Sequence, residues 1–147
     1  MNDALNIETR IVTAPGVVKD NSAFTCAAVD TLGKRYCSFE FIFGATDVDM
    51  ATLKLQESDD DGSSDAYADV DGADFSVDSV LPQDDEDNKI FAIHVDMRGG
   101  RKRYLKPVAV PGDGSVGTYM IAVARLSRGE TFARSAADRG YTRELFV

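Results

Sequence analysis

The sequence consists of short runs of β-branched and aromatic residues, which Gly, Pro, Asp or Asn interrupt every ~10–15 positions. The clearest run, residues 36–43 (YCSFEFIF), is hydrophobic at every second position, namely at Cys37, Phe39, Phe41 and Phe43. Because successive side chains of a strand point to opposite faces, this side of the run is expected to face a core. The pattern predicts an all-β fold: an antiparallel β-sandwich of the jelly-roll or immunoglobulin-like type, with about seven or eight strands.

Further segments have the composition or the alternation of strands, and turn residues bound them. They are residues 8–14, 23–29, 51–57, 90–96, 104–110 and 117–126. Pro107 lacks an N–H group, so it predicts an edge strand or a bulge at that position. Residues 58–72 are rich in Asp and small side chains, which predicts a long solvated loop with at most a short extended piece.

Two parts of the chain are expected to behave differently. Residues 1–126 form the predicted sandwich domain, and residues 127–147 form a C-terminal arm without consistent alternation. The arm is too apolar for a disordered tail, because it carries Phe132, Tyr141, Leu145 and Phe146 along with Arg128, Arg134, Arg139 and Arg143. It is expected either to pack back over its own sandwich or to reach a neighbouring subunit.

Charge is distributed unevenly along the chain. The formal net charge is -9, with 21 Asp and Glu against 6 Lys and Arg in residues 1–97, and 4 against 10 in residues 98–147. A strongly acidic body repels phosphates, so nucleic acid is not an expected partner. The basic C-terminal third is suited to an acidic protein partner, including another copy of the chain.

The sequence has no apolar run near the ~20 residues that cross a bilayer, so no membrane span is expected. Residues 1–10 contain Asp3 and Glu8 and lack the basic flank and apolar stretch of a secretory signal. Synthesis in a cytoplasm is therefore expected.

Cys26 and Cys37 have no zinc-binding spacing. If residues 30–33 (DTLG) form a tight turn between two strands, symmetric pairing places Cys26 opposite Cys37. Two reduced, buried thiols and a cross-strand disulfide are both compatible with this interpretation.

The acidic loop begins like a calcium-binding loop. Glu57, Asp59 and Asp61 stand at positions 1, 3 and 5, Gly62 at position 6, and Asp65 at position 9. Position 12 then lacks its bidentate Glu, and no helices are expected to flank the loop. No metal and no cofactor are therefore expected, although a calcium site outside the EF-hand type could use these four carboxylates and recruit Asp69 or Asp71.

No catalytic centre is expected, and we interpret the chain as a non-enzyme. His94, which is the one histidine, is predicted to face away from Phe91, Ile93 and Val95 on its strand. A nucleophilic dyad or triad needs further groups in a recognisable motif, such as GxSxG, which the sequence lacks. The absence of Trp also weakens a sugar-binding interpretation.

The basic cluster of Arg98, Arg101, Lys102 and Arg103 follows a strand and surrounds two glycines. It is either a solvated loop or a surface that docks on an acidic neighbour. These four residues, together with Phe132, Arg134, Tyr141, Leu145 and Phe146 of the arm, are the predicted partner-binding residues.

Several motifs between residues 23 and 126 resemble those of a known family. They are DTLGKRYCSFEFIFGATD, LKLQESDDDG, GADF, DDEDNK, RGGRKRYLK and PGDGSVGTY. Together they resemble small β-sandwich virion structural proteins of tailed phages and prophages, of the capsid decoration or cement type.

The resemblance implies a capsid decoration protein that binds the major capsid protein and other virion subunits, and that stabilises the shell. It implies a homo-oligomer, such as a trimer, located on the virion surface, and it carries no catalytic residues. A tail or head-to-tail connector component is one alternative. A calcium-dependent or glycan-binding β-sandwich module is another.

Overall fold

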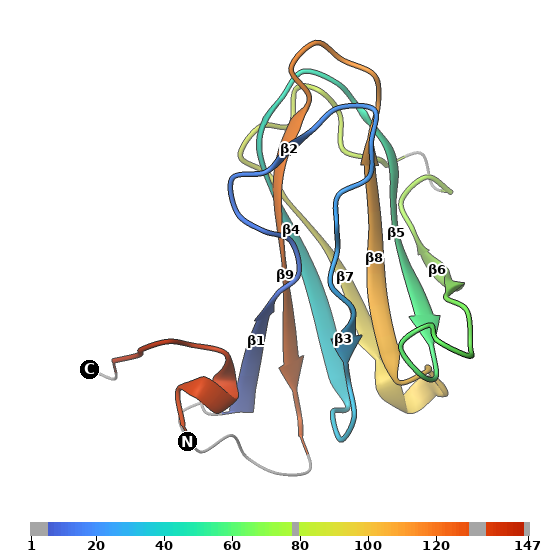
Figure 1. Cartoon of the computed structure of the whole chain (residues 1–147), viewed down its shortest axis with the longest axis vertical. Coiled ribbons are helices and arrows are strands. Elements are labelled where there is room, and N and C mark those ends of the chain that lie inside the picture. The colour runs from blue at the N-terminus through green and yellow to red at the C-terminus, as the bar shows by residue number, and fades with distance from the viewer. Residues whose placement is uncertain (1–5, 78–79, 130–134, 146–147) are drawn as a thin grey trace.

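The computed structural model describes residues 6–77, 80–129 and 135–145. Two antiparallel sheets pack face to face, which confirms the predicted all-β sandwich (Figure 1). The strands are β1 (Ile7–Ile11), β2 (Val18–Lys19), β3 (Val29–Asp30), β4 (Tyr36–Thr46), β5 (Met50–Ser58), β6 (Ala68–Asp74), β7 (Ile90–Asp96), β8 (Tyr104–Pro111) and β9 (Thr118–Ser127). Two 3₁₀ helices, η2 (Met97–Gly99) and η3 (Ala137–Arg139), complete the described elements.

Sheet A has the strand order β1-β9-β4-β7, with β2 also paired to β9, and sheet B has the order β3-β8-β5-β6. Four of the strand pairs follow the order of a folded hairpin, namely β1 with β9, β3 with β8, β4 with β7 and β5 with β6. The chain is thus one long hairpin that winds around the sandwich, so that most successive long strands lie in opposite sheets. This is a jelly-roll arrangement, the first of the two types that the sequence left open.

The core lies between β4 and β9 of sheet A and β5 and β8 of sheet B. The four alternate side chains predicted to face the core from residues 36–43 are all buried. Phe39 lies opposite Ala124 and Phe41 opposite Ala122, so large side chains of β4 sit beside small ones of β9. Burial of each such Phe contributes ~1.5–3 kcal/mol, which makes this layer the main source of cohesion between the sheets.

Turn 30–33 does not form the predicted hairpin. Val29 and Asp30 pair with Leu105 and Tyr104 of β8 in sheet B, whereas β4 begins in sheet A. The turn therefore crosses between the sheets, as the jelly-roll winding requires. The interpretation of residues 23–29 as one strand is wrong for the same reason, since Val29 alone among them belongs to a strand.

The two cysteines are consequently not opposite each other. Cys37 lies opposite Val95 and Leu126, while Cys26 precedes β3 on the other sheet. Both thiols are free and buried. Burial raises the pKa of Cys37 to about 12 and that of Cys26 to about 11.

We expect neither native thiol to react with a maleimide or with iodoacetamide at pH 8, because the reactive thiolate is both scarce and shielded. In denaturant both thiols should react fully. Mass spectrometry of the alkylated chain before and after unfolding measures this. Rapid modification of the native chain would show that the core around Cys37 is open.

The prediction of an edge strand or a bulge at Pro107 is wrong, because β8 lies between β3 and β5 and its register with β5 is regular at this residue. β8 has neighbours on both sides, but β3 pairs with residues 104 and 105 alone. The Ala109 carbonyl accepts from Phe24 N–H, so residue 107, two positions away, also turns its backbone nitrogen toward the β3 side. The missing N–H group therefore falls where the ladder to β3 has already ended.

Candidate subunit-contact surfaces

The basic loop follows β7 and begins with η2. Asp96 caps η2 by accepting from the backbone N–H of Arg98, and the Arg98 guanidinium pairs with the same carboxylate at 2.5 Å. These bonds hold the pKa of Asp96 at about 2. At the far end of the loop, Arg103 pairs with Asp30 at 2.6 Å and lies over the Tyr104 ring.

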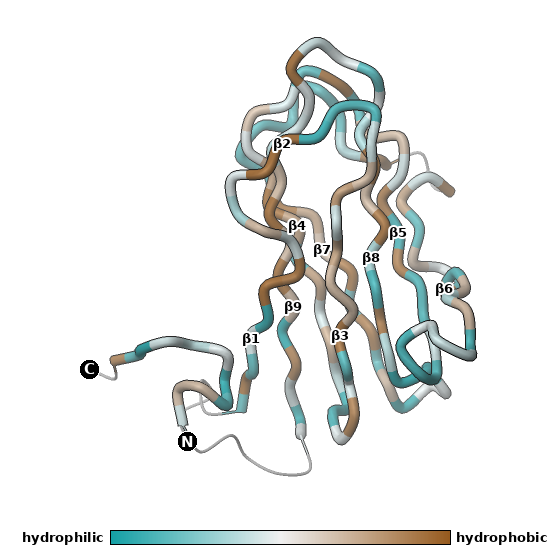
Figure 2. The backbone as a smooth tube through the Cα atoms, viewed as in Figure 1, coloured by the Kyte–Doolittle hydropathy of each residue, from teal (hydrophilic) through white to brown (hydrophobic). Residues whose placement is uncertain are grey.

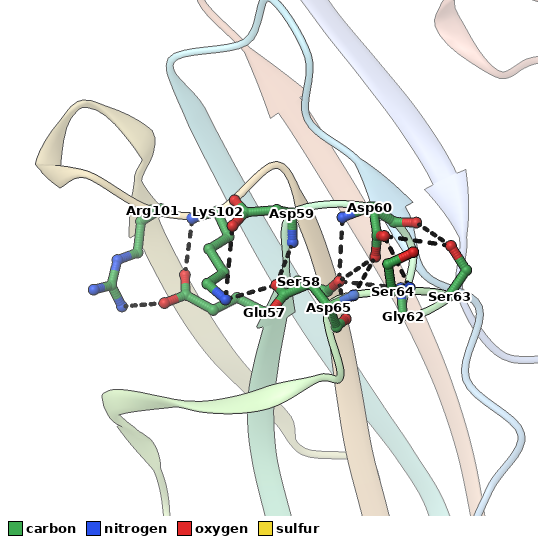
Figure 3. A network of polar contacts seen from close by, with 10 residues as sticks. All are labelled: Glu57, Ser58, Asp59, Asp60, Gly62, Ser63, Ser64, Asp65, Arg101 and Lys102. Carbon is green, nitrogen blue, oxygen red and sulfur yellow. Dashed lines mark hydrogen bonds and ion pairs between the residues drawn. The ribbon is translucent and has the colours of Figure 1, made fainter.

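The middle of the basic loop contacts the acidic loop that joins β5 to β6, as Figure 3 shows. Lys102 Nζ lies 2.6 Å from Asp65 and 3.7 Å from Asp59. The backbone N–H of Lys102 donates to Glu57, and the Arg101 guanidinium lies 3.6 Å from the same carboxylate. The hydrogen bond from Lys102 lowers the pKa of Asp65.

All four predicted basic contact residues thus have carboxylate partners on their own chain. The prediction that they bind a partner subunit stays a prediction, but their charge is already largely balanced. Sequence reasoning missed the pairs of Lys102 because its partners lie far away along the chain: Glu57 and Asp65 are 45 and 37 positions from Lys102. Register between β5 and β8 brings them together.

Three of the four candidate calcium ligands already contact basic groups of their own chain. Glu57, Asp59 and Asp65 face Arg101 and Lys102, as described above. The neighbouring Asp60 carboxylate instead accepts from the backbone N–H groups of Ser64 and Asp65, at 2.9 and 3.0 Å. Among the residues that the structure describes, no group of three or more His, Cys, Asp or Glu could hold a metal ion.

Several carboxylates have a lowered pKa, so the chain should lose stability in acid. At the other end of the sandwich, the Asp47 carboxylate accepts from the N–H groups of Ser115, Val116 and Gly117, and these bonds lower its pKa. The pKa values of Asp30, Asp65 and Asp96 are lowered by Arg103, Lys102 and Arg98.

A carboxylate with a lowered pKa stabilises the folded chain above its unfolded pKa of about 4, and this contribution is lost as pH falls through the folded pKa. We therefore expect the melting temperature to drop steeply between about pH 4 and pH 2, where Asp96 titrates with a pKa of about 2. Calorimetry across this range measures it. A melting temperature that stays constant from pH 4 to pH 2 would contradict the described network.

The described part of the C-terminal arm packs on its own chain, against β1 (Figure 1). The Tyr141 hydroxyl is 2.9 Å from Thr9 Oγ1, and Arg139 is 3% exposed and pairs with Glu144. Leu145 is 92% exposed. Of the predicted partner-binding residues, Phe132, Arg134 and Phe146 lie outside the described residues.

The outer face of sheet A carries an apolar patch that sequence reasoning missed. Register places Ile42 opposite both Ile90 and Ile121, so that three isoleucines form one row across β7, β4 and β9. Two further cross-strand pairs flank this row. We define the A patch as Ile11, Val18, Ile42, Ile90, Tyr119, Ile121 and Val123.

Five members of the A patch are between 38% and 66% exposed, namely Ile11, Val18, Ile42, Ile90 and Tyr119. The outer face of sheet B is different, because Lys54 and Gln56 both contact Asp69 there and Lys106 lies over the Tyr67 ring. Figure 2 shows hydrophobic colour at β2 and mostly hydrophilic colour along the loop between β5 and β6. The two outer faces are therefore not equivalent.

His94 lies on the outer face of sheet A, as predicted, and it stacks on Tyr36 with ring centroids 6.0 Å apart. Its cross-strand partner is Ser38, which is buried. A cleft of about 420 Å³ between the edges of β1 and β3 is lined by charged and aliphatic residues, including Glu8, Arg10 and Lys34. Its lining contains no aromatic ring on which a sugar could stack.

None of the helices in the described ranges is long and apolar enough to cross a membrane. Comparisons of the chain with protein-family models, with curated proteins and with solved structures found no match.

Proposed function

We propose that this chain is a structural subunit of a tailed-phage particle, and that it acts as a capsid decoration or cement protein on the major capsid protein. The observation that carries the proposal is the A patch. An apolar surface of this extent on one outer sheet face is typical of a protein contact surface, and a subunit that packs against other subunits, copies of itself included, needs no catalytic centre.

The segments that carry the resemblance to phage head proteins support this role. DTLG forms the turn that crosses between the sheets, and QESDD and RKRYLK supply the two loops joined through Lys102. GDGSVG forms the turn whose N–H groups donate to Asp47. The shared motifs thus build the framework of the sandwich, which is what a family of structural proteins has in common.

The jelly roll itself is compatible with the proposal but does not decide it. This fold occurs in viral capsid proteins, and also in lectins and cupins. The latter two classes use a sugar platform or a metal centre. Among the described residues, the cleft beside β1 has no aromatic ring on which a sugar could stack, and no cluster of side chains could hold a metal ion.

Quantitative mass spectrometry of purified particles tests the proposal. We expect the chain to be present in a fixed ratio to the major capsid protein, with a copy number of the order of the capsomer number. Multivalent binding to equivalent lattice sites would then give avidity from modest single contacts. Absence from the particle would refute the proposal. A few copies per particle would refute the decoration role and favour a tail or connector position.

A further inference from the structure

The A patch has the dimensions of the centre of a protein interface. It spans four neighbouring strands, about 4.8 Å apart, and about four residues along them, at ~3.3 Å each, which is a sheet area of about 250 Å² before the side chains at its borders are added. A standard interface buries about 800 Å² per partner, with an apolar centre and a polar rim. The A patch with its surrounding polar residues is within that range.

Charge determines which partner this surface fits. The chain has a net charge of -9, so two copies repel each other over most of their surfaces. The outer face of sheet A is an exception. Its central charges are Glu40 and Arg125, which form a pair at 3.5 Å directly beside the patch.

An apolar patch next to one positive and one negative group is self-complementary. In a two-fold interface a contact from one residue to another recurs in the reverse direction, so Glu40 of each copy can pair with Arg125 of the other. The geometry is also favourable, since two sheet faces with alternating aliphatic rows pack at about 10 Å. The inner face of the same sheet already packs in this way against sheet B.

We infer that the A patch is the interface of a two-fold dimer, in which the outer faces of sheet A of two copies pack together. The use of this dimer in a particle rests on the proposed function, whereas the dimer itself can be tested without a particle. The interface places Ile42 at its centre and the Glu40–Arg125 pairs directly beside it. It leaves sheet B and the basic loop outside.

Light scattering or native mass spectrometry of the full chain between about 1 and 100 µM tests the inference. We expect a mass twice that of the 15.9 kDa chain. Ile42→Glu should raise the dissociation constant about 100-fold or more, because it buries an unpaired charge at the centre. Val108→Glu is the matched control, since Val108 is a half-buried β-branched residue on the outer face of sheet B, opposite Lys54. This variant should remain dimeric.

Charge reversal gives a second readout, which a loss of folding could not imitate. Chains with Glu40→Arg carry two positive charges beside the patch, and chains with Arg125→Glu carry two negative ones. Each variant alone should be monomeric, and an equimolar mixture should form a heterodimer.

The remaining outcomes separate a failure of the inferred dimer from a failure of the proposed function. A wild-type chain that is monomeric at 100 µM, or a mixture of the charge variants that does not associate, would refute the dimer. If the monomeric chain still binds particles, and Ile42→Glu abolishes that binding, the patch contacts the shell instead and the proposed function stands. A dimer that is absent from purified particles would leave the inference standing and refute the proposed function.

Discussion

Replacing Phe41 by Ala is expected to lower the free energy of unfolding by about 3–5 kcal/mol. Phe41 is fully buried, and it lies opposite Phe91 on β7 and Ala122 on β9. On the β9 side the neighbour is an Ala, which is too small to fill the cavity that the ring would leave, so the loss includes the cost of a cavity. Urea denaturation measures the loss. Since a typical domain has ~5–15 kcal/mol of stability, the variant is expected to be partly unfolded at 37 °C.

The matched control for Phe41→Ala is Tyr119→Ala, which removes an aromatic ring from the outer face of the same sheet. Tyr119 is 41% exposed, so this change should cost less than about 1.5 kcal/mol. Equal losses in the two variants would mean that the inner layer of sheet A is not the core.

Gly140→Ala is expected to release the C-terminal arm from β1. Gly140 has a φ of 85°, and a Cβ atom there would lie 1.7 Å from the carbonyl oxygen of Thr9, which belongs to the backbone and cannot move aside. Arg139 is 3% exposed in the docked arm and should become accessible. Limited digestion with trypsin measures this, and the rate of cleavage after Arg139 should rise about 10-fold or more.

Gly16→Ala is the control that separates the steric clash of a Cβ at residue 140 with Thr9 from the backbone strain of a positive φ. Gly16 also has a positive φ, of 80°, but no atom lies within 4 Å of the position of its Cβ. It should therefore show the strain of a left-handed Ala, ~1–2 kcal/mol, and unchanged cleavage after Arg139. If trypsin cleaves the Gly140→Ala variant after Arg139 no faster than it cleaves the wild-type chain, the arm does not dock on β1 as described.

The alternation of hydrophobic and polar residues was sufficient to predict the strands of the core. Residues 36–43 predicted the buried face of β4, and residues 90–96 coincide with β7. This succeeds because each side chain's direction depends on local geometry alone. The jelly-roll pairing could not be predicted in the same way, since β1 pairs with β9 across more than a hundred positions.

The contact surfaces illustrate the same limit. Ile42, Ile90 and Ile121 each look like a single aliphatic residue on the wet side of a strand, which is common and carries no meaning by itself. Only the register of three strands places them in one row. The ion pairs of Lys102 with the acidic loop also depend on register, so a basic loop and an acidic loop that looked like separate surfaces are one network.

We expect the outer face of sheet A to be a protein contact surface in the assembled state. The most direct test is thiol labelling in purified particles that contain a chain with one introduced cysteine, since the native thiols are buried. Ala92→Cys reports on sheet A, because Ala92 is exposed on β7 opposite Glu40, and Asp71→Cys reports on the exposed surface of β6 in sheet B. We predict that position 92 is protected from a bulky maleimide while position 71 reacts. Equal labelling at the two positions would contradict the account.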